Sequence, residues 1–228
     1  LVHTLLGRRV LALSLVAILI SVGSGMGASL SMYWLLYYYQ FSQAALSLLV
    51  LALTLGIAAT ALTPRLTGWL GKRGAMLLLV WVYLGATAFP LVMRLADLVP
   101  AGSAVLVLLV AAQGAVGTAT MTMVMIVLTS MVADLTEEAE ARTGQRSEAM
   151  LLASLNFIRK ATQGLGALGA GFILTLVAFP VGAERHDVGT GQLDSLALYY
   201  LASKIALYLA ASLVLGFYRY DRKAARLE

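Results

Sequence analysis

Three polar residues within an apolar part of the sequence could do chemistry: Asn156, Lys160 and Gln163. Their spacing of four and then three residues places them on one face of a helix. Small residues extend this face, namely Ala153, Gly164, Ala167 and Gly171. A lysine inside an apolar segment is costly unless it is solvated or paired. We therefore predict that this face borders a watery cleft or another helix and binds a solute.

Lys160 has a second interpretation. The segment Ala161–Val181 alone is about long enough to cross a bilayer. Lys160 and its neighbour Arg159 would then be anchors at the membrane surface. The sequence leaves both interpretations open.

The last apolar segment also has polar groups near its start. Tyr199 and Tyr200 open this segment, and both are expected as anchors in the headgroup layer. Lys204 lies two turns into the segment. Its side chain is expected to extend outward to the same layer.

Two further residues are candidate solute ligands. Gln113 lies inside an apolar segment, where its own helix cannot satisfy an amide. Thr122 follows further along the same segment, although Ser and Thr side chains commonly bond to their own backbone. Gly164–Gly169 matches GxGxxG, but no strand precedes it, so we attribute these glycines to close helix packing. Gly23 and Gly27 have the same explanation.

Enzyme chemistry is not expected. The two histidines, His3 and His186, lie outside the apolar segments, and cysteine is absent. Ser24 has no partner that would make it a nucleophile. We find no metal-ligand cluster and no phosphate-binding loop in the sequence. The sequence therefore predicts no catalytic residue, no metal and no resident cofactor.

The elements that hold these residues follow from composition. The chain has 228 residues, of which 61% are hydrophobic and 12% charged. So few charged residues cannot cover the surface of a soluble domain, whereas an apolar surface is stable in a lipid bilayer. In the bilayer the backbone N–H and C=O groups must hydrogen-bond to one another. We predict an all-α integral membrane protein with six transmembrane helices. They are expected at Val10–Leu36, Ala44–Leu62, Ala75–Val92, Ser103–Val132, Ala149–Phe179 and Leu196–Phe217.

The distribution of Lys and Arg between these segments predicts orientation. The two ends and every second connection hold eleven of them, and the opposite connections hold two, Arg94 and Arg185. Because basic residues stay in the cytoplasm, both termini are predicted to be cytoplasmic, in the inner (plasma) membrane. The net charge of +5 is then loop charge, so no nucleic-acid partner is expected.

The region after the fourth segment has a specific pattern. It reads Ala133-Asp134, then RTGQRSE at Arg142–Glu148, then NFIRK at Asn156–Lys160, and a glycine-rich apolar run to Pro180. This resembles the glycoside–pentoside–hexuronide cation symporters, the melibiose-permease-like branch of the major facilitator superfamily. The turn at Leu70–Arg73 also resembles this family, although its usual acidic residue is missing.

The resemblance implies that residues 1–228 form one domain, corresponding to helices seven to twelve of a twelve-helix transporter. Its partners would be the N-terminal six-helix half, the lipid bilayer and a small solute. Lys160 matches a solute-facing lysine, and Asn156 matches a sugar-facing position. A cytoplasmic gate network would comprise Asp134, Arg142, Arg146 and Glu148, unless these residues form only a solvated loop.

Two functions from different classes follow. The first is secondary transport of a sugar or glycoside-like solute by alternating access, as a cation symport. The coupling Na⁺ or H⁺ would bind in the absent N-terminal half. The alternative is a complete six-helix protein that acts as a homodimeric channel or as a membrane scaffold. Six more apolar segments upstream would favour the first, and a start codon just before Leu1 would favour the second.

Overall fold

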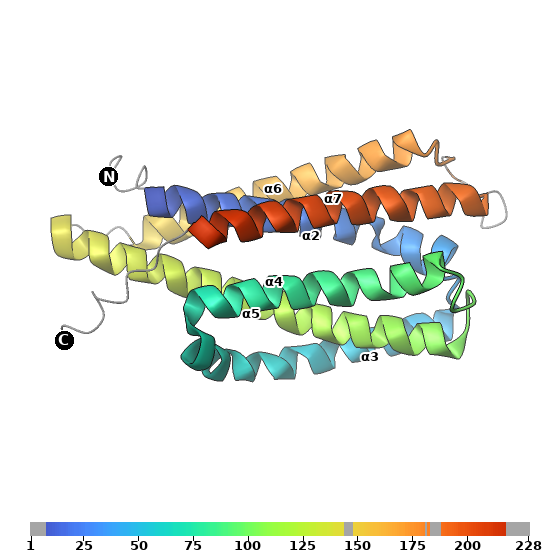
Figure 1. The fold of residues 1–228 in the computed structure, drawn as a ribbon, viewed down its shortest axis with the longest axis horizontal. Coiled ribbons are helices and arrows are strands. Elements are labelled where there is room, and N and C mark those ends of the chain that lie inside the picture. Colours follow the sequence, from blue (N-terminus) through green and yellow to red (C-terminus); the bar gives the residue numbers. More distant parts are fainter. Residues whose placement is uncertain (1–7, 144–147, 181, 183–187, 218–228) are drawn as a thin grey trace.

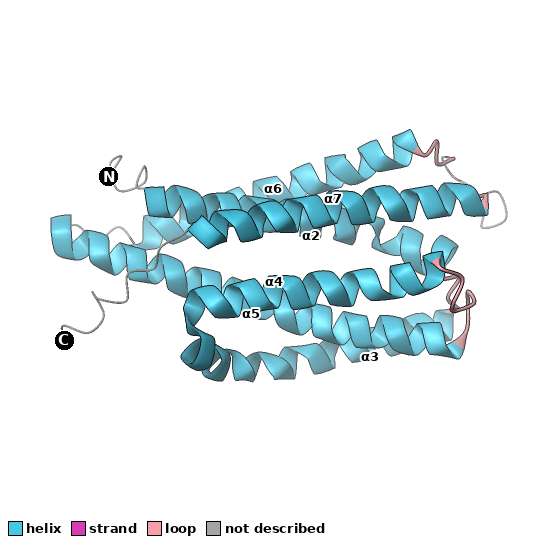
Figure 2. Cartoon of the chain, in the orientation of Figure 1, coloured by secondary structure: helices cyan, strands magenta, loops and turns pink. Residues whose placement is uncertain are grey.

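The computed structural model describes residues 8–143, 148–180, 182 and 188–217, and these form long helices with no strand among them (Figures 1 and 2). The predicted all-α class is confirmed. A π-helical turn, η1, follows the first helix, and a short 3-10 helix, η2, follows the second. The elements in chain order are α2 (Arg8–Tyr33), η1 (Trp34–Tyr38), α3 (Gln43–Ala58), η2 (Ala59–Leu62), α4 (Thr63–Leu95), α5 (Ala104–Thr143), α6 (Glu148–Leu176) and α7 (Thr190–Phe217).

Within the described residues, four helical stretches are long and apolar enough to cross a membrane. They are Val10–Tyr38, Gln43–Leu95, Ala104–Glu137 and Thr190–Phe217. The second contains both α3 and α4, which form two arms joined by a bend and both pack against α5 (Figure 1). Helix α6 is not among the four, since its polar residues lower the hydropathy of its N-terminal half. A membrane protein is thus confirmed.

Three helices, α4, α5 and α7, extend beyond their predicted ends, and α7 begins at Thr190 instead of Leu196. Helix α5 continues past Val132 to Thr143, through Leu, Glu, Ala and Arg residues that favour helix. Helix α4 begins at Thr63, with proline at its first positions, where a missing N–H costs least. Gly71 interrupts α4 with a φ of 72°. Glycine adopts this left-handed conformation without a steric penalty. The helix therefore kinks just before Lys72.

The helices pack as two equivalent triplets. Helix α2 packs against α6 and α7, and α5 packs correspondingly against α3 and α4, while α4 contacts α7. If α2, α3 and α4 are matched in order with α5, α6 and α7, the contact of α2 with α6 corresponds to that of α5 with α3. The contact of α2 with α7 then corresponds to that of α5 with α4, and the contact of α4 with α7 corresponds to itself. Because each triplet has an odd number of helices, the second has the opposite direction through the bundle, as in inverted repeats.

Glycines allow the close crossings in both triplets. A Cβ atom at Gly25 of α2 would collide with the carbonyl oxygen of Gln163 on α6, and one at Gly166 would collide with that of Val22. At the equivalent crossing, a Cβ at Gly56 of α3 would collide with the Ala115 carbonyl oxygen of α5. The packing role predicted for these glycines is confirmed at Gly166, whereas Gly164 has no neighbour within 4 Å.

Two apolar clusters fill the bundle, one toward each end. One contains Leu13, Val16, Met76 and Leu215, and the other contains Leu30, Leu106 and Leu196. Each cluster draws on α2, α4, α5 and α7. Some of the polar residues described next belong to these clusters, Tyr208 to the first and Trp34 and Tyr200 to the second.

Candidate functional site

A cavity of about 250 Å³ lies against the apolar cluster that contains Leu30, Leu106 and Leu196, and it reaches the middle of α4 and α7 at Tyr83 and Lys204. Residues of α2, η1, α3, α4, α5 and α7 line it, and most of its surface is apolar. Its polar groups include those of Lys204, Tyr200, Tyr83, Thr87, Gln113 and Trp34. Typical ligand pockets have volumes of roughly 300–1,000 Å³, so this slightly smaller one suits a small solute or one end of a larger one.

Lys204 of α7 is the only charged side chain that lines this cavity among the described residues. Its side chain is 1% exposed. The ammonium donates a hydrogen bond of 2.8 Å to the Tyr200 hydroxyl and lies 4.8 Å from the ring centre of Tyr83. The rings of Tyr200 and Tyr208 are at 5.1 and 5.9 Å. We call Lys204 with these three tyrosines the tyrosine cage.

The expectation that Lys204 extends outward to the headgroups is wrong. Tyr200, Lys204 and Tyr208 are four residues apart and share the face of α7 that packs against α2 and α4. The lysine stem therefore begins inside the bundle and ends among aromatic rings. Each cation–π contact contributes about 0.5–2 kcal/mol, whereas removing an ammonium from water costs several kcal/mol. The tyrosine cage offsets only part of that cost.

Glycines on α2 make room for the tyrosine cage. A Cβ at Gly27 would lie 2.8 Å from the Tyr200 hydroxyl, and one at Gly23 would lie 3.2 Å from the ring of Tyr208. The sequence interpretation of this glycine pair as a packing device is confirmed, with α7 as the neighbouring helix. Bulkier residues here would displace the tyrosines that hold the ammonium of Lys204.

The π-helical turn brings aromatic side chains to the cavity. Trp34 and Tyr39 are five residues apart, so a regular α-helix would point them to different faces. The turn at η1 is closed by a hydrogen bond of 2.8 Å from the Tyr39 N–H to the Trp34 carbonyl. This wider turn lets both side chains line the cavity. Trp34 Nε1 is buried and has no hydrogen-bond partner among the described residues. A donor without an acceptor thus lies in the cavity wall.

Of the predicted solute ligands, Gln113 alone lines this cavity. It is half-buried and makes no hydrogen bond to another described residue. Thr122 is exposed on α5, away from the cavity lining. The structure thus does not bring the five candidates into one site.

The predicted polar face of α6 is exposed over its described length. Asn156, Lys160 and Gln163 are all exposed, and a Cβ at Gly164 or Gly171 would meet no other described residue within 4 Å. We call these five residues the α6 stripe. The stripe is separate from the cavity. The neighbouring Arg159 packs against α5, where its guanidinium donates to Met125 Sδ at 3.2 Å.

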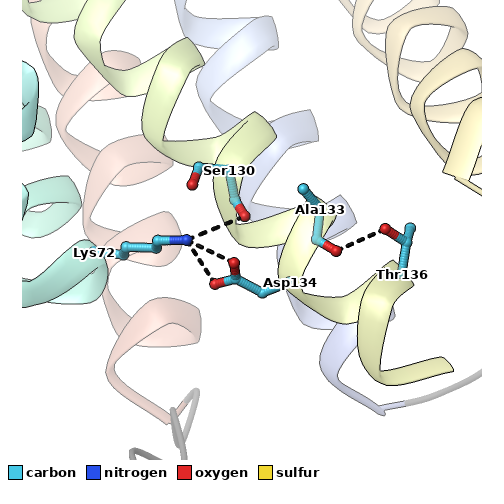
Figure 3. A network of polar contacts seen from close by, with 5 residues as sticks. All are labelled: Lys72, Ser130, Ala133, Asp134 and Thr136. Carbon is cyan, nitrogen blue, oxygen red and sulfur yellow. Dashed lines mark hydrogen bonds and ion pairs between the residues drawn. The ribbon is translucent and has the colours of Figure 1, made fainter. Parts of the chain in front are cut away.

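At one end of the bundle, Asp134 of α5 pairs with a residue outside the predicted network. The Lys72 ammonium lies 2.7 and 2.8 Å from the two carboxylate oxygens and also donates to the Ser130 carbonyl at 3.4 Å (Figure 3). The kink at Gly71 directs Lys72 toward α5. Arg146 and the side chains of Arg142 and Glu148 lie outside the described residues.

A second contact ties the same end of α4 to α7. The Arg73 guanidinium donates a hydrogen bond to the Gly216 carbonyl in the last turn of α7. Lys72 and Arg73 therefore hold α5 and α7 from adjacent positions. The RTGQRSE pattern drew attention to the loop after α5, whereas the LGKR turn carried the signal for this contact.

A helical membrane bundle with a mostly apolar cavity that presents a few polar groups is compatible with a solute carrier. The model of the family described as MFS/sugar transport protein matches residues 3–222. The chain belongs to this family. Membership confirms the resemblance seen in the sequence, and it indicates a transporter of sugar-like solutes rather than an enzyme. No curated protein matches the sequence.

For an MFS/sugar transport protein, the tyrosine cage is the feature that the sequence interpretation missed. Tyr199 and Tyr200 are both expected in the headgroup layer, yet Tyr199 is 50% exposed and Tyr200 is 4% exposed. The signal that could have shown the difference is the spacing of Tyr200, Lys204 and Tyr208, which puts two rings beside one cation. A lysine flanked in this way can be held inside a bundle without reaching the headgroups.

Proposed function

We propose that this protein is the C-terminal six-helix half of a twelve-helix secondary transporter that moves a sugar-like solute by alternating access. The family match over residues 3–222 carries the proposal. The inverted triplets support it, because such repeats place a solute site near the middle of the membrane. One side of the cavity is formed by Tyr83 and Lys204, which lie near the middle of α4 and α7.

In this proposal each of α2 to α7 crosses the membrane once. Helices α3 and α4 form the two arms of the stretch Gln43–Leu95, which is 53 residues long. One crossing needs about 20 residues, so this stretch suffices for two. Both termini then lie in the cytoplasm of a cell whose plasma membrane holds the protein. The excess of Lys and Arg at that end supports this orientation.

The α6 stripe would face the N-terminal half across the transport cleft. Its lysine and amides are exposed, which is unfavourable against lipid and favourable against water or a solute. Lys160, Asn156 and Gln163 would bind hydroxyl groups of the solute, with Thr122 on the adjacent helix. Gln113 would meet the part of the solute that enters the cavity.

The ion pair of Lys72 and Asp134 would belong to the cytoplasmic gate. It joins α4 to α5 about two turns before Arg142, and Arg146 and Glu148 follow in the sequence. Rocking of the two halves would require such contacts to break and re-form. A coupling Na⁺ or H⁺ would bind in the other half, where the carboxylates for it are expected.

Uptake tests this function directly. The protein from its complete reading frame is reconstituted in liposomes, and entry of radiolabelled D-glucose and D-galactose is measured with and without gradients of Na⁺ and H⁺. We expect saturable uptake that a gradient of one cation drives above equilibrium. Absence of saturable uptake under every gradient would contradict the proposal, and uptake without gradient dependence would contradict the coupling alone.

A further inference from the structure

The cavity holds more hydrogen-bond donors than the described residues satisfy. An ammonium has three N–H donors and no acceptor. That of Lys204 makes one hydrogen bond, to Tyr200, and no ion pair with a described residue. Buried charges in proteins are normally paired. A cation that is 1% exposed beside an open cavity therefore lacks a counter-ion among the described residues.

Trp34 is an independent indication of the same chemistry. Its ring is 6% exposed, its Nε1–H has no acceptor in the part of the chain that the structure describes, and it lines the same cavity. The rings of Trp34 and Tyr200 are 5.2 Å apart, and the ammonium of Lys204 is 5.1 Å from that Tyr200 ring. The two unsatisfied donors thus flank one tyrosine. Both require an oxygen acceptor, and the cation requires a negative one.

The remaining polar groups of the cavity suit the rest of a small hydroxylated molecule. Ser31 donates its hydroxyl proton to the Ala28 carbonyl at 2.7 Å, and Thr87 donates to the Tyr83 carbonyl at 2.9 Å. Their hydroxyl oxygens can therefore accept hydrogen bonds from solute hydroxyls. The Gln113 amide can both donate and accept. Negative charge is favoured near Lys204, and hydroxyls are favoured along the other walls.

We propose that this cavity binds the carboxylate of a small organic anion, of the sugar-acid type, with the Lys204 ammonium as its counter-ion and Trp34 Nε1 as a second donor. The inference rests on the proposed transport function and narrows its solute class. A carboxylate from another part of the protein could instead be the counter-ion of Lys204. The experiment distinguishes this protein carboxylate from the carboxylate of a solute.

The test compares sugars that differ in one group. D-Glucuronate and D-galacturonate carry a carboxylate where D-glucose and D-galactose carry a hydroxymethyl group. Binding to the reconstituted protein is measured by calorimetry, and uptake is measured as counterflow. A charge-assisted hydrogen bond in a buried site predicts at least about tenfold tighter binding of the acid in one of the two pairs. Equal affinity within both pairs would overturn the inference.

Variants assign that preference to named groups. Lys204→Met keeps the length of the side chain and is expected to remove the acid preference while binding of the neutral sugar persists. Trp34→Phe should weaken acid binding severalfold, whereas Trp81→Phe, on a ring that is 45% exposed, should change nothing. Tyr200→Phe is likewise expected to weaken acid binding, whereas its exposed neighbour Tyr199→Phe should change nothing. If the Lys204 variant fails to fold, the Trp34 and Tyr200 variants test the proposal by themselves.

Three other outcomes are distinguishable. Acid preference that persists in Lys204→Met would overturn the assignment to this cavity. Thermal destabilisation of Lys204→Met without solute, combined with no acid preference in the wild type, would identify a carboxylate of the protein as the counter-ion and overturn the solute assignment. Uptake of neutral sugars without acid preference contradicts this inference alone, and absence of binding and uptake for all four sugars contradicts the proposed function as well.

Discussion

Gly166 and Gly164 offer a direct test of how the bundle is packed. They lie two residues apart on α6, and the structure gives them opposite surroundings. A Cβ at Gly166 would collide with the Val22 carbonyl oxygen and would lie 2.8 Å from the Met26 backbone nitrogen. A Cβ at Gly164 would meet no other described residue within 4 Å. Alanine at the two positions should therefore have opposite effects on stability.

The magnitude follows from the geometry. To reach an ordinary contact of 3.4 Å, the new methyl group and the Met26 nitrogen must move apart. The nitrogen is a backbone atom of α2 and the methyl group is attached directly to the backbone of α6, so the two helices themselves must separate. Overpacking of this kind costs about 1–3 kcal/mol. Replacing glycine by alanine in a helix returns about 0.5–1 kcal/mol. We expect Gly166→Ala to lose about 1–2 kcal/mol and Gly164→Ala to gain up to about 1 kcal/mol.

The assay is thermal unfolding of both variants and the wild type in the same detergent. For a chain of about 150–250 residues, each kcal/mol shifts the midpoint by about 2–4 °C. Gly166→Ala should therefore unfold several degrees below Gly164→Ala. Equal midpoints for the two variants would refute the close crossing of α2 and α6. A larger loss at Gly164 than at Gly166 would refute the direction in which α6 faces.

The remaining predictions concern the gate, the α6 stripe and topology. A double-mutant cycle of Lys72→Met and Asp134→Asn should give a coupling below about 1 kcal/mol in stability, because both side chains are partly exposed, yet each single variant should slow transport. Normal uptake in both variants would exclude a gate role. Lys160→Ala should lower uptake at least tenfold while Lys160→Arg retains more of it, and unchanged uptake and affinity would exclude the cleft assignment. Cysteine introduced at Gly189 should react with an impermeant thiol reagent in intact cells, and cysteine at Glu137 should not, whereas the reverse pattern would invert the orientation.

The sequence predicted the helical elements well because bilayer physics acts locally. A long apolar run in lipid must satisfy its own backbone, so the run itself specifies a helix. Helix ends were less accurate, as at the end of α5, because residues beyond the apolar run can also favour helix. The shared face of the α6 stripe was also accessible, since residues spaced by four and three positions share a face whatever surrounds them.

The direction of the Lys204 side chain could not be predicted from its own helix. Its own helix allows the side chain either to extend toward the headgroups or to turn inward, and the choice depends on α2 and α4. Tyr83 comes from a helix more than a hundred residues earlier in the chain, and the glycines of α2 provide the space for the rings. Similarly, the pairing of Lys72 with Asp134 joins two helices whose contact no local pattern specifies.

The sequence by itself therefore determined that the chain lies in a lipid bilayer, and it determined the helices, the family and the shared polar face of α6. It could do so because hydropathy and helical periodicity depend only on neighbouring residues. The tertiary structure alone decided which polar groups share a cavity and which buried charge has no counter-ion among the described residues. Burial of a charged or donor group is a property of all the helices packed around it, so it exists only after the bundle has formed.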